Sequence, residues 1–209
     1  MGIFRYSAVE TDYLAERDPV LGRAIRRIGP IERRVTPDLF EALAESIVGQ
    51  QISGKAAETV WRRLNALTGG VTPQSIVQAA VEALRGCGLS LRKVGYLQEA
   101  ARAALEGRLD EKELAAMSDR EVVDRLTALP GVGVWTAEML MIFSMQRPDV
   151  VSFGDLAIRR GVMRLYGLES LSRREFETYR SRWSPYGTVA SFYLWAVAHE
   201  PDGMSPVEK

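Results

Sequence analysis

Residues 129–135 read LPGVGVW, a glycine-containing turn between two stretches of helical character. Upstream, Ser118 and Glu121 have the spacing of a capping box, which predicts a helix from about residue 118 to 128. The proline and the glycines should end that helix, because proline lacks an amide hydrogen and glycine can adopt positive φ. From Val134 onward apolar residues recur at helical spacing, so a second helix is expected directly after the turn.

The turn predicts an anion-binding site. The N–H groups of Gly131, Gly133 and Val134 would lie at the N-terminus of the second helix, where the helix dipole also favours negative charge. Asp155 follows Trp135 by twenty residues, so a carboxylate could face the molecule that carries the anion. The alternative is a purely structural turn, since glycine turns between helices are common in α proteins.

These residues resemble the helix-hairpin-helix DNA glycosylases. Residues 129–135 match the hairpin of that family, and Asp155 stands at the spacing of its essential aspartate. Residues 40–64 resemble the helix and loop that enter the DNA minor groove. Residues 182–186 and Trp195 resemble the closing helices of the branch that removes alkylated bases, the 3-methyladenine DNA glycosylase II type. The similarity covers most of the chain.

Composition and helix signals predict an all-α protein. The 209 residues are 46% hydrophobic, enough to bury a core in one or two domains. Cap residues and prolines mark about ten short helices, and no alternating strand pattern of useful length is visible. The resemblance implies two helical domains with DNA in the cleft between them and no N-terminal β domain. One would be a barrel-like domain of residues 45–150 that ends in the hairpin, and the other would join residues 1–44 with 151–209.

The sequence argues against several kinds of site: disulfides, iron–sulfur clusters, side-chain metal sites and membrane-spanning segments. The single cysteine, Cys87, excludes an internal disulfide and the four-cysteine iron–sulfur cluster of some glycosylases. His199 is the only histidine and has no ligand-spaced partner, so we expect no metal site built from side chains and no cofactor. The resemblance leaves open a monovalent cation bound by backbone carbonyls of the hairpin. With no long apolar run and no cationic leader, we expect no membrane association. A cytoplasmic or otherwise intracellular monomer is the expectation.

The charge balance argues against strong non-specific DNA binding. Lysines and arginines number 27, aspartates and glutamates also 27, so the net charge is zero. Hairpin amides and a local basic patch could still bind a few phosphates. The candidates for this patch are Lys55, Arg92, Lys93, Arg159 and Arg160. A solvated helix face is the alternative for each of them.

The resemblance makes Asp155 the catalytic residue. Breaking an N-glycosidic bond develops positive charge on the sugar, as in glycoside hydrolysis. A carboxylate stabilises that charge and can orient or deprotonate the attacking water. The alternative is that Asp155 only caps a helix over residues 156–166, although capping and catalysis are compatible.

Trp135 indicates the type of reaction. Family members that also cut the DNA strand have at this position a lysine that forms a Schiff base, so tryptophan predicts hydrolysis alone. An indole also suits a cationic alkylated purine, with a gain of ~0.5–2 kcal/mol. Trp195, Tyr193 and Met139 are the candidates for the other walls of the base pocket. These residues could equally belong to the core, and Met139 replaces an aromatic residue of some relatives.

A flipped base leaves a gap in the DNA, and the resemblance places Gln51 in it. Gln50 should turn inward, and Ser53 completes the DNA-binding loop. The alternative for Gln51 is an ordinary exposed polar residue. Gly187 stands where many members of the branch have an arginine, so one DNA contact is expected to be missing.

Two other functions stay open at this point. The protein could be a glycosylase for deaminated, oxidised or mismatched bases. It could also be a non-catalytic helix-hairpin-helix protein that only binds bent or damaged double-stranded DNA. The Trp135 pocket favours alkylated purines over the other lesions. Asp155 and Gln51 argue against a pure binder, which needs neither residue.

Overall fold

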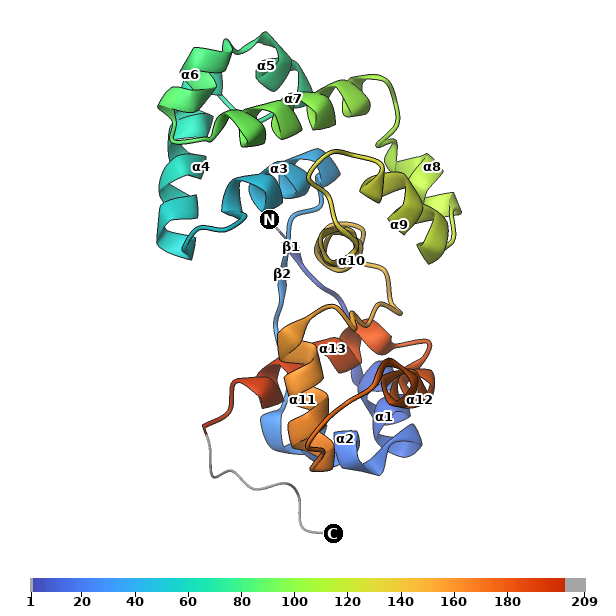
Figure 1. Cartoon of the computed structure of the whole chain (residues 1–209). Coiled ribbons are helices and arrows are strands. Elements are labelled where there is room, and N and C mark those ends of the chain that lie inside the picture. The colour runs from blue at the N-terminus through green and yellow to red at the C-terminus, as the bar shows by residue number, and fades with distance from the viewer. Residues whose placement is uncertain (1, 202–209) are drawn as a thin grey trace. The chain divides into compact units, whose positions relative to one another are not determined.

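The computed structural model describes residues 2–201, and its helices group into two compact units. The central unit comprises residues 36–145, and the terminal unit joins residues 1–35 to 146–209. Within the described part of the chain there are 13 α-helices and one short two-stranded ribbon (Figure 1). The all-α prediction is therefore confirmed. No helix of residues 2–201 is both long and apolar enough to cross a membrane.

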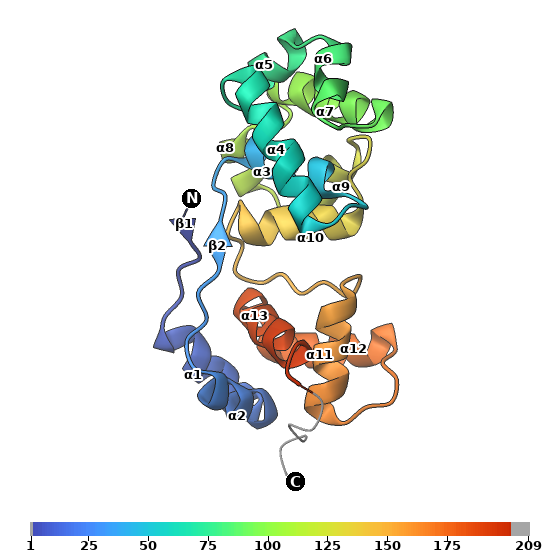
Figure 2. The same ribbon diagram turned by 90° about the vertical axis from the view of Figure 1, so that its left-hand side faces the viewer.

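The central unit is built around α3. Its helices are α3 (Leu39–Gly49), α4 (Gly54–Thr68), α5 (Pro73–Gln78), α6 (Val81–Gly86), α7 (Leu91–Leu105), α8 (Glu111–Ala116), α9 (Asp119–Thr127) and α10 (Val134–Phe143). Helix α3 packs against α4, α7 and α10, and six of its residues are buried (Figure 2). Because α3 packs here along its whole length, the unit begins at residue 36, whereas the sequence analysis placed the boundary within this helix, after residue 44.

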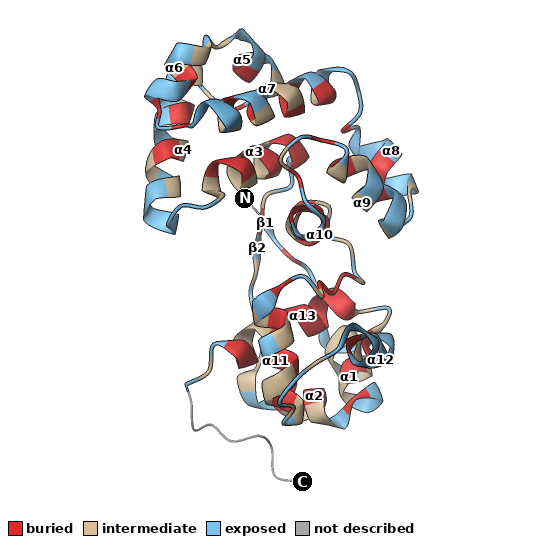
Figure 3. Ribbon diagram, in the orientation of Figure 1, coloured by how far each residue is buried: buried red, intermediate tan, exposed pale blue. Residues whose placement is uncertain are grey.

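The terminal unit is built around α13. Its elements are β1 (Gly2–Ile3), α1 (Ala8–Arg17), α2 (Pro19–Ile28), β2 (Arg34–Val35), α11 (Leu156–Tyr166), α12 (Arg173–Trp183) and α13 (Gly187–Ala198). Ten of the twelve residues of α13 are buried (Figure 3). A Cβ atom added at Gly161 of α11 would lie 2.2 Å from the carbonyl oxygen of Leu194, so only glycine permits this close approach of α11 and α13.

The ribbon of β1 and β2 adds two short strands in a part of the chain where the sequence shows no strand pattern. The strands are antiparallel, with Gly2 opposite Val35 and Ile3 opposite Arg34. Each strand has two residues, which is too short to produce an alternating hydrophobic pattern in the sequence.

Most predicted helix starts are confirmed. Ser118 forms the capping box that starts α9, and Asp155 is the N-cap of α11. The pair Thr36–Pro37 has the pattern of a cap residue before a first helical proline, which predicts a helix start at Thr36. That prediction is wrong, because Asp38 caps α3 by accepting a hydrogen bond from the Glu41 amide at 2.8 Å. The Thr36 amide instead donates to the carbonyl oxygen of Phe143.

Candidate functional site

Asp155 is a buried carboxylate at the start of α11. It is 8% exposed, and its Oδ1 atom accepts a hydrogen bond from the Ile158 amide at 2.9 Å. The same atom accepts a second hydrogen bond from the indole Nε1 of Trp195 at 3.2 Å. Burial of a carboxylate is costly unless donors satisfy it, and here one donor comes from α11 and the other from α13.

Trp195 is held by its neighbours on the terminal unit. Its ring lies nearly parallel to that of buried Phe192, with centroids 6.2 Å apart. Phe192 in turn packs edge-on against Phe4, and the Arg33 guanidinium lies 5.9 Å from its ring centroid. Trp195 is partly exposed, so one side of the Asp155–Trp195 pair is accessible to solvent. The predicted catalytic residue and one predicted pocket wall are therefore in direct contact.

Tyr193 belongs to a different region of the terminal unit. Its side chain is buried, and its hydroxyl donates to the carbonyl oxygen of Gly29 at 3.2 Å and lies 3.4 Å from the hydroxyl of Tyr6. Burial and the Tyr6 hydroxyl raise the pKa of Tyr193. Tyr193 and Trp195 are two positions apart on α13, a spacing that does not share a helix face.

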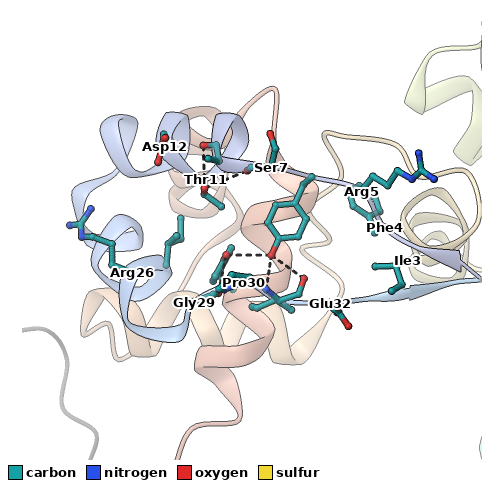
Figure 4. A pocket seen from close by; sticks show the side chains of 15 residues that line it. Ile3, Phe4, Arg5, Ser7, Thr11, Asp12, Arg26, Gly29, Pro30 and Glu32 are labelled. Atoms are coloured by element: carbon teal, nitrogen blue, oxygen red, sulfur yellow. Dashed lines mark hydrogen bonds between the residues drawn. The ribbon is translucent and has the colours of Figure 1, made fainter.

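Tyr193 lines a hollow of about 780 Å³ that does not include Asp155 or Trp195. Its walls are the segment of residues 3–8, the start of α1 and the residues that follow α2 (Figure 4). We therefore leave Tyr193 out of the proposed base pocket.

The hairpin of the central unit has two glycines with different surroundings. Gly131 has φ +82, and a Cβ atom added there would lie 2.3 Å from the ring of Tyr96. Gly133 is the N-cap of α10, with an ordinary φ of −94. A Cβ atom at Gly133 would meet no atom within 4 Å, and no side chain caps this helix end. The first glycine is thus required by the fold, whereas the second faces open space at a helix N-terminus.

The first turn of α10 presents apolar side chains to solvent. Val134 is 55% exposed and Trp135 is 48% exposed, although most of the helix behind them is buried. Met139 is partly exposed and lies one turn after Trp135, on the same face of the helix. These two side chains form an accessible apolar surface next to the hairpin.

The loop between α3 and α4 contains the predicted intercalating residue. Gln51 is exposed and has φ +58, an uncommon conformation for a residue with a side chain. Gln50 turns inward as predicted, but its Nε2 donates at 2.9 Å to the carbonyl oxygen of Gly131, in the hairpin. Ser53 is the N-cap of α4 and accepts a hydrogen bond from the Ala56 amide at 3.3 Å.

The candidate phosphate contacts fall into two groups. Lys55, Arg92 and Arg160 are exposed on helix surfaces. Arg159 is partly exposed, with its guanidinium 5.3 Å from the ring centroid of Phe153. Lys93 does not belong with the phosphate contacts, because its ammonium group binds two backbone carbonyls of its own unit.

The surroundings of residue 187 explain why a glycine stands there. A Cβ atom there would lie 2.6 Å from Oδ1 of Asp149, which accepts a hydrogen bond from the Gly187 amide at 3.1 Å. The other carboxylate oxygen of Asp149 accepts from the Ser184 hydroxyl at 2.6 Å. A side chain at position 187, including the arginine of the family pattern, would therefore have to displace the Asp149 carboxylate from these hydrogen bonds.

The sequence did not indicate two residues that organise the site, Tyr96 and Gly161, or the binding of Lys93 to two carbonyls. Each depends on a contact between segments far apart in the sequence, for which no local pattern exists. In residues 2–201, no three histidine, cysteine, aspartate or glutamate side chains are grouped so as to hold a metal ion.

The chain is similar to known proteins over most of its length. The family described as "HhH-GPD superfamily base excision DNA repair protein" matches residues 44–185. The chain is 35% identical over 173 residues to DNA-3-methyladenine glycosylase 1 of Schizosaccharomyces pombe, covering 80% of this chain and 76% of that protein. It is similar to the crystal structure of a DNA-3-methyladenine glycosidase from Bacillus halodurans, with a TM-score of 0.88, 37% identity, and 95% and 93% of the two chains covered.

A DNA complex is also among the similar structures. The 3-methyladenine DNA glycosylase of Schizosaccharomyces pombe bound to abasic DNA has a TM-score of 0.75 and 30% identity. The match covers 89% of this chain and 94% of that one.

Proposed function

Because the chain belongs to the HhH-GPD superfamily of base excision DNA repair proteins, we propose that it is a monofunctional DNA glycosylase for alkylated bases. Its substrates are purines of the 3-methyladenine and 7-methylguanine type in double-stranded DNA. It hydrolyses the N-glycosidic bond and leaves the strand intact, and it acts as a monomer. The relatives named 3-methyladenine glycosylases support the substrate class.

The observation that carries the proposal is the Asp155–Trp195 pair. A carboxylate with fixed orientation can stabilise the positive charge that develops on the deoxyribose as the base departs. It can also orient the water that then attacks the sugar carbon, accepting the proton that this water loses. The hydrogen bonds from Ile158 and Trp195 hold the carboxylate without reorganisation during the reaction. Catalysis by Asp155 is compatible with its position as a helix cap.

Trp135 and Met139 are proposed to bind the flipped base. The half-exposed indole offers a π face to a base that methylation has made cationic. Position 135 holds no amine, so no Schiff base forms with the sugar there and no strand cleavage follows.

DNA binding is assigned to the central unit and to one arginine of the terminal unit. The exposed amides of Gly133 and Val134 bind a phosphate at the N-terminus of α10, with Gly131 shaping the turn. Gln51 fills the gap left by the flipped base. Gln50 and Ser53 support that loop, and Lys55 and Arg159 contact further phosphates.

Release of free base from methylated duplex DNA tests this function. Wild type should release 3-methyladenine or 7-methylguanine, and alkali should then cleave the abasic strand. Asp155→Asn should lose this activity by about 10²–10³-fold, the order expected for a group that stabilises transition-state charge. The variant should keep its fold and its DNA affinity, since asparagine also caps helices.

Asp110→Asn is the matched control. Asp110 is also an aspartate at a helix N-cap and accepts a hydrogen bond from the Glu113 amide at 2.8 Å. This variant should release bases like wild type. Release by Asp155→Asn at the wild-type rate would contradict the catalytic assignment. DNA binding without release of any alkylated, deaminated or oxidised base would identify a non-catalytic binder instead.

A further inference from the structure

Lys93 is bound to the end of the helix that precedes the Gln50–Gln51 loop. Its Nζ donates to the carbonyl oxygen of Val48 and to that of Gln50, each at 2.7 Å. These carbonyls lie at the C-terminus of α3, where orphan acceptors and the helix dipole favour a cation. The side chain is partly buried, and burial lowers the pKa of the Lys93 ammonium, with a smaller contribution from Arg92.

The second of these carbonyls, that of Gln50, directly precedes Gln51 in the loop. Gln50 directs its side chain to the carbonyl oxygen of Gly131, and Gln51 follows it in the left-handed region. That conformation costs a residue with a side chain on the order of 1–3 kcal/mol, so surrounding contacts must hold it. The bond from Lys93 to the Gln50 carbonyl lies at the peptide that joins the two glutamines.

The same face of α7 also supports the hairpin. Tyr96 is one turn after Lys93, and its ring lies against Gly131. Helix α7 therefore contacts the loop through Lys93 and the hairpin through Tyr96, and the Gln50 side chain joins these two segments directly. All of these contacts lie within the central unit.

We propose that Lys93 is a positioning residue for base flipping. It fixes the α3–α4 loop so that Gln51 is already in the conformation that fills the gap when the protein meets DNA. Lys93 itself touches neither the sugar nor the base. This inference rests on the proposed function, because Gln51 fills a gap only if a base is flipped.

The test compares two duplexes in single-turnover base release. In one, the methylated base is paired; in the other, it lies opposite an abasic-site analogue, so flipping breaks no base pair and leaves no orphaned partner base. Lys93→Met should release base about tenfold more slowly from the paired duplex, the order expected for losing a charged hydrogen-bond donor, and at the wild-type rate from the unpaired one. Lys93→Arg should restore most of the rate, because a guanidinium can also donate to two carbonyls. Lys112→Met, which removes an exposed lysine of α8, should equal wild type on both duplexes.

Gln51→Ala adds a double-mutant cycle. If Lys93 acts through Gln51, the double variant should be no slower than Gln51→Ala alone. Equal losses on both duplexes, or additive losses in the cycle, would show that Lys93 only stabilises the fold, and the proposal would be wrong.

Hydrogen exchange in the free protein tests the positioning role of Lys93 without relying on base release. Lys93→Met should speed amide exchange in residues 50–53 and leave the buried part of α3 unchanged. If wild type releases no base from any duplex, the proposed function fails, and unchanged exchange in this variant would independently refute the positioning role.

Discussion

The two units carry opposite kinds of functional surface. In the terminal unit, Asp155 is 8% exposed and is held by donors from two helices. In the central unit, Val134 is 55% exposed, Trp135 is 48% exposed, and Gly133 faces open space. The terminal unit fixes one carboxylate, and the central unit exposes backbone amides and an aromatic ring.

The difference follows from what each unit is proposed to bind. A carboxylate that stabilises a transient charge must be oriented in advance, which burial and donors achieve. A phosphate is large and solvated, so its donors must be accessible, and neutral amides at a helix end suffice. Variants of the Asp155–Trp195 pair should therefore change the rate of base release, and variants of the hairpin amides should change DNA affinity.

Gly161→Ala should have the largest effect on stability. The added methyl group would lie 2.2 Å from the backbone carbonyl oxygen of Leu194, so α11 and α13, which carry Asp155 and Trp195, would have to move apart. We expect a loss of about 2–3 kcal/mol in the free energy of unfolding, as for overpacked cores, together with slower base release. Urea denaturation and single-turnover assays measure the two effects.

Gly95→Ala is the control for that substitution. Gly95 lies within α7, and a Cβ atom there meets nothing within 4 Å, so alanine should stabilise the helix by about 0.5–1 kcal/mol. If Gly161→Ala behaved like Gly95→Ala, close contact of α11 and α13 would not hold the catalytic pair.

Substitutions of the two hairpin glycines should have different effects, one on stability and the other on DNA binding. Gly131→Ala should destabilise the protein by about 1–3 kcal/mol, because of positive φ and the contact with Tyr96. Gly133→Ala should leave thermal stability unchanged and weaken DNA binding, because its methyl group would stand where the phosphate approaches. Thermal melts and fluorescence anisotropy with duplex DNA check both variants. Normal affinity of Gly133→Ala would show that the hairpin does not face a phosphate.

Trp195→Phe should have a moderate effect confined to the reaction. It removes the indole N–H that binds Asp155 at 3.2 Å and keeps an aromatic ring against Phe192. We expect base release about tenfold slower, since a hydrogen bond to a charged group is lost, with unchanged affinity for undamaged DNA. Reduced affinity with an unchanged rate would reverse the assignment of roles.

The smallest expected effect concerns the ionisation of the Cys87 thiol, which lies in the central unit. The thiol is buried at the end of α6, and burial raises its pKa above the ordinary value of 9.0. Because the thiolate reacts with iodoacetamide, alkylation of the native protein should be slow and should rise with pH later than alkylation of the unfolded chain. The unfolded thiol ionises first, so this group should lower stability as pH rises past 9.0. A native labelling profile equal to the unfolded one would contradict this burial.

Local signals in the sequence predicted much of this architecture. Capping residues such as Ser118 and Asp155 marked helix starts correctly, since a cap depends on residues three positions apart. The fold of the hairpin followed from its proline and glycines. The ribbon of β1 and β2 could not be predicted, because two-residue strands depend on pairing between distant segments.

The site was predicted less completely than the fold. The sequence predicts both Trp195 and Tyr193 as walls of the base pocket. Trp195 does contact Asp155, whereas Tyr193 faces another part of the terminal unit. The sequence predicts Lys93 as a phosphate contact, because a lysine near a helix start does not reveal that two carbonyls lie within reach of its ammonium group. Such contacts are set by how α3 and α7 pack, which periodicity alone does not determine.

Single-turnover base release as a function of enzyme concentration tests the division between the units most directly. The comparison is between wild type, Asp155→Asn and Gly133→Ala on the same methylated duplex. We predict that Gly133→Ala reaches the wild-type rate once enzyme saturates the DNA, whereas Asp155→Asn stays about 10²–10³-fold slower at every concentration. Recovery of Asp155→Asn at high concentration, or a Gly133→Ala rate that stays low at saturation, would contradict the account.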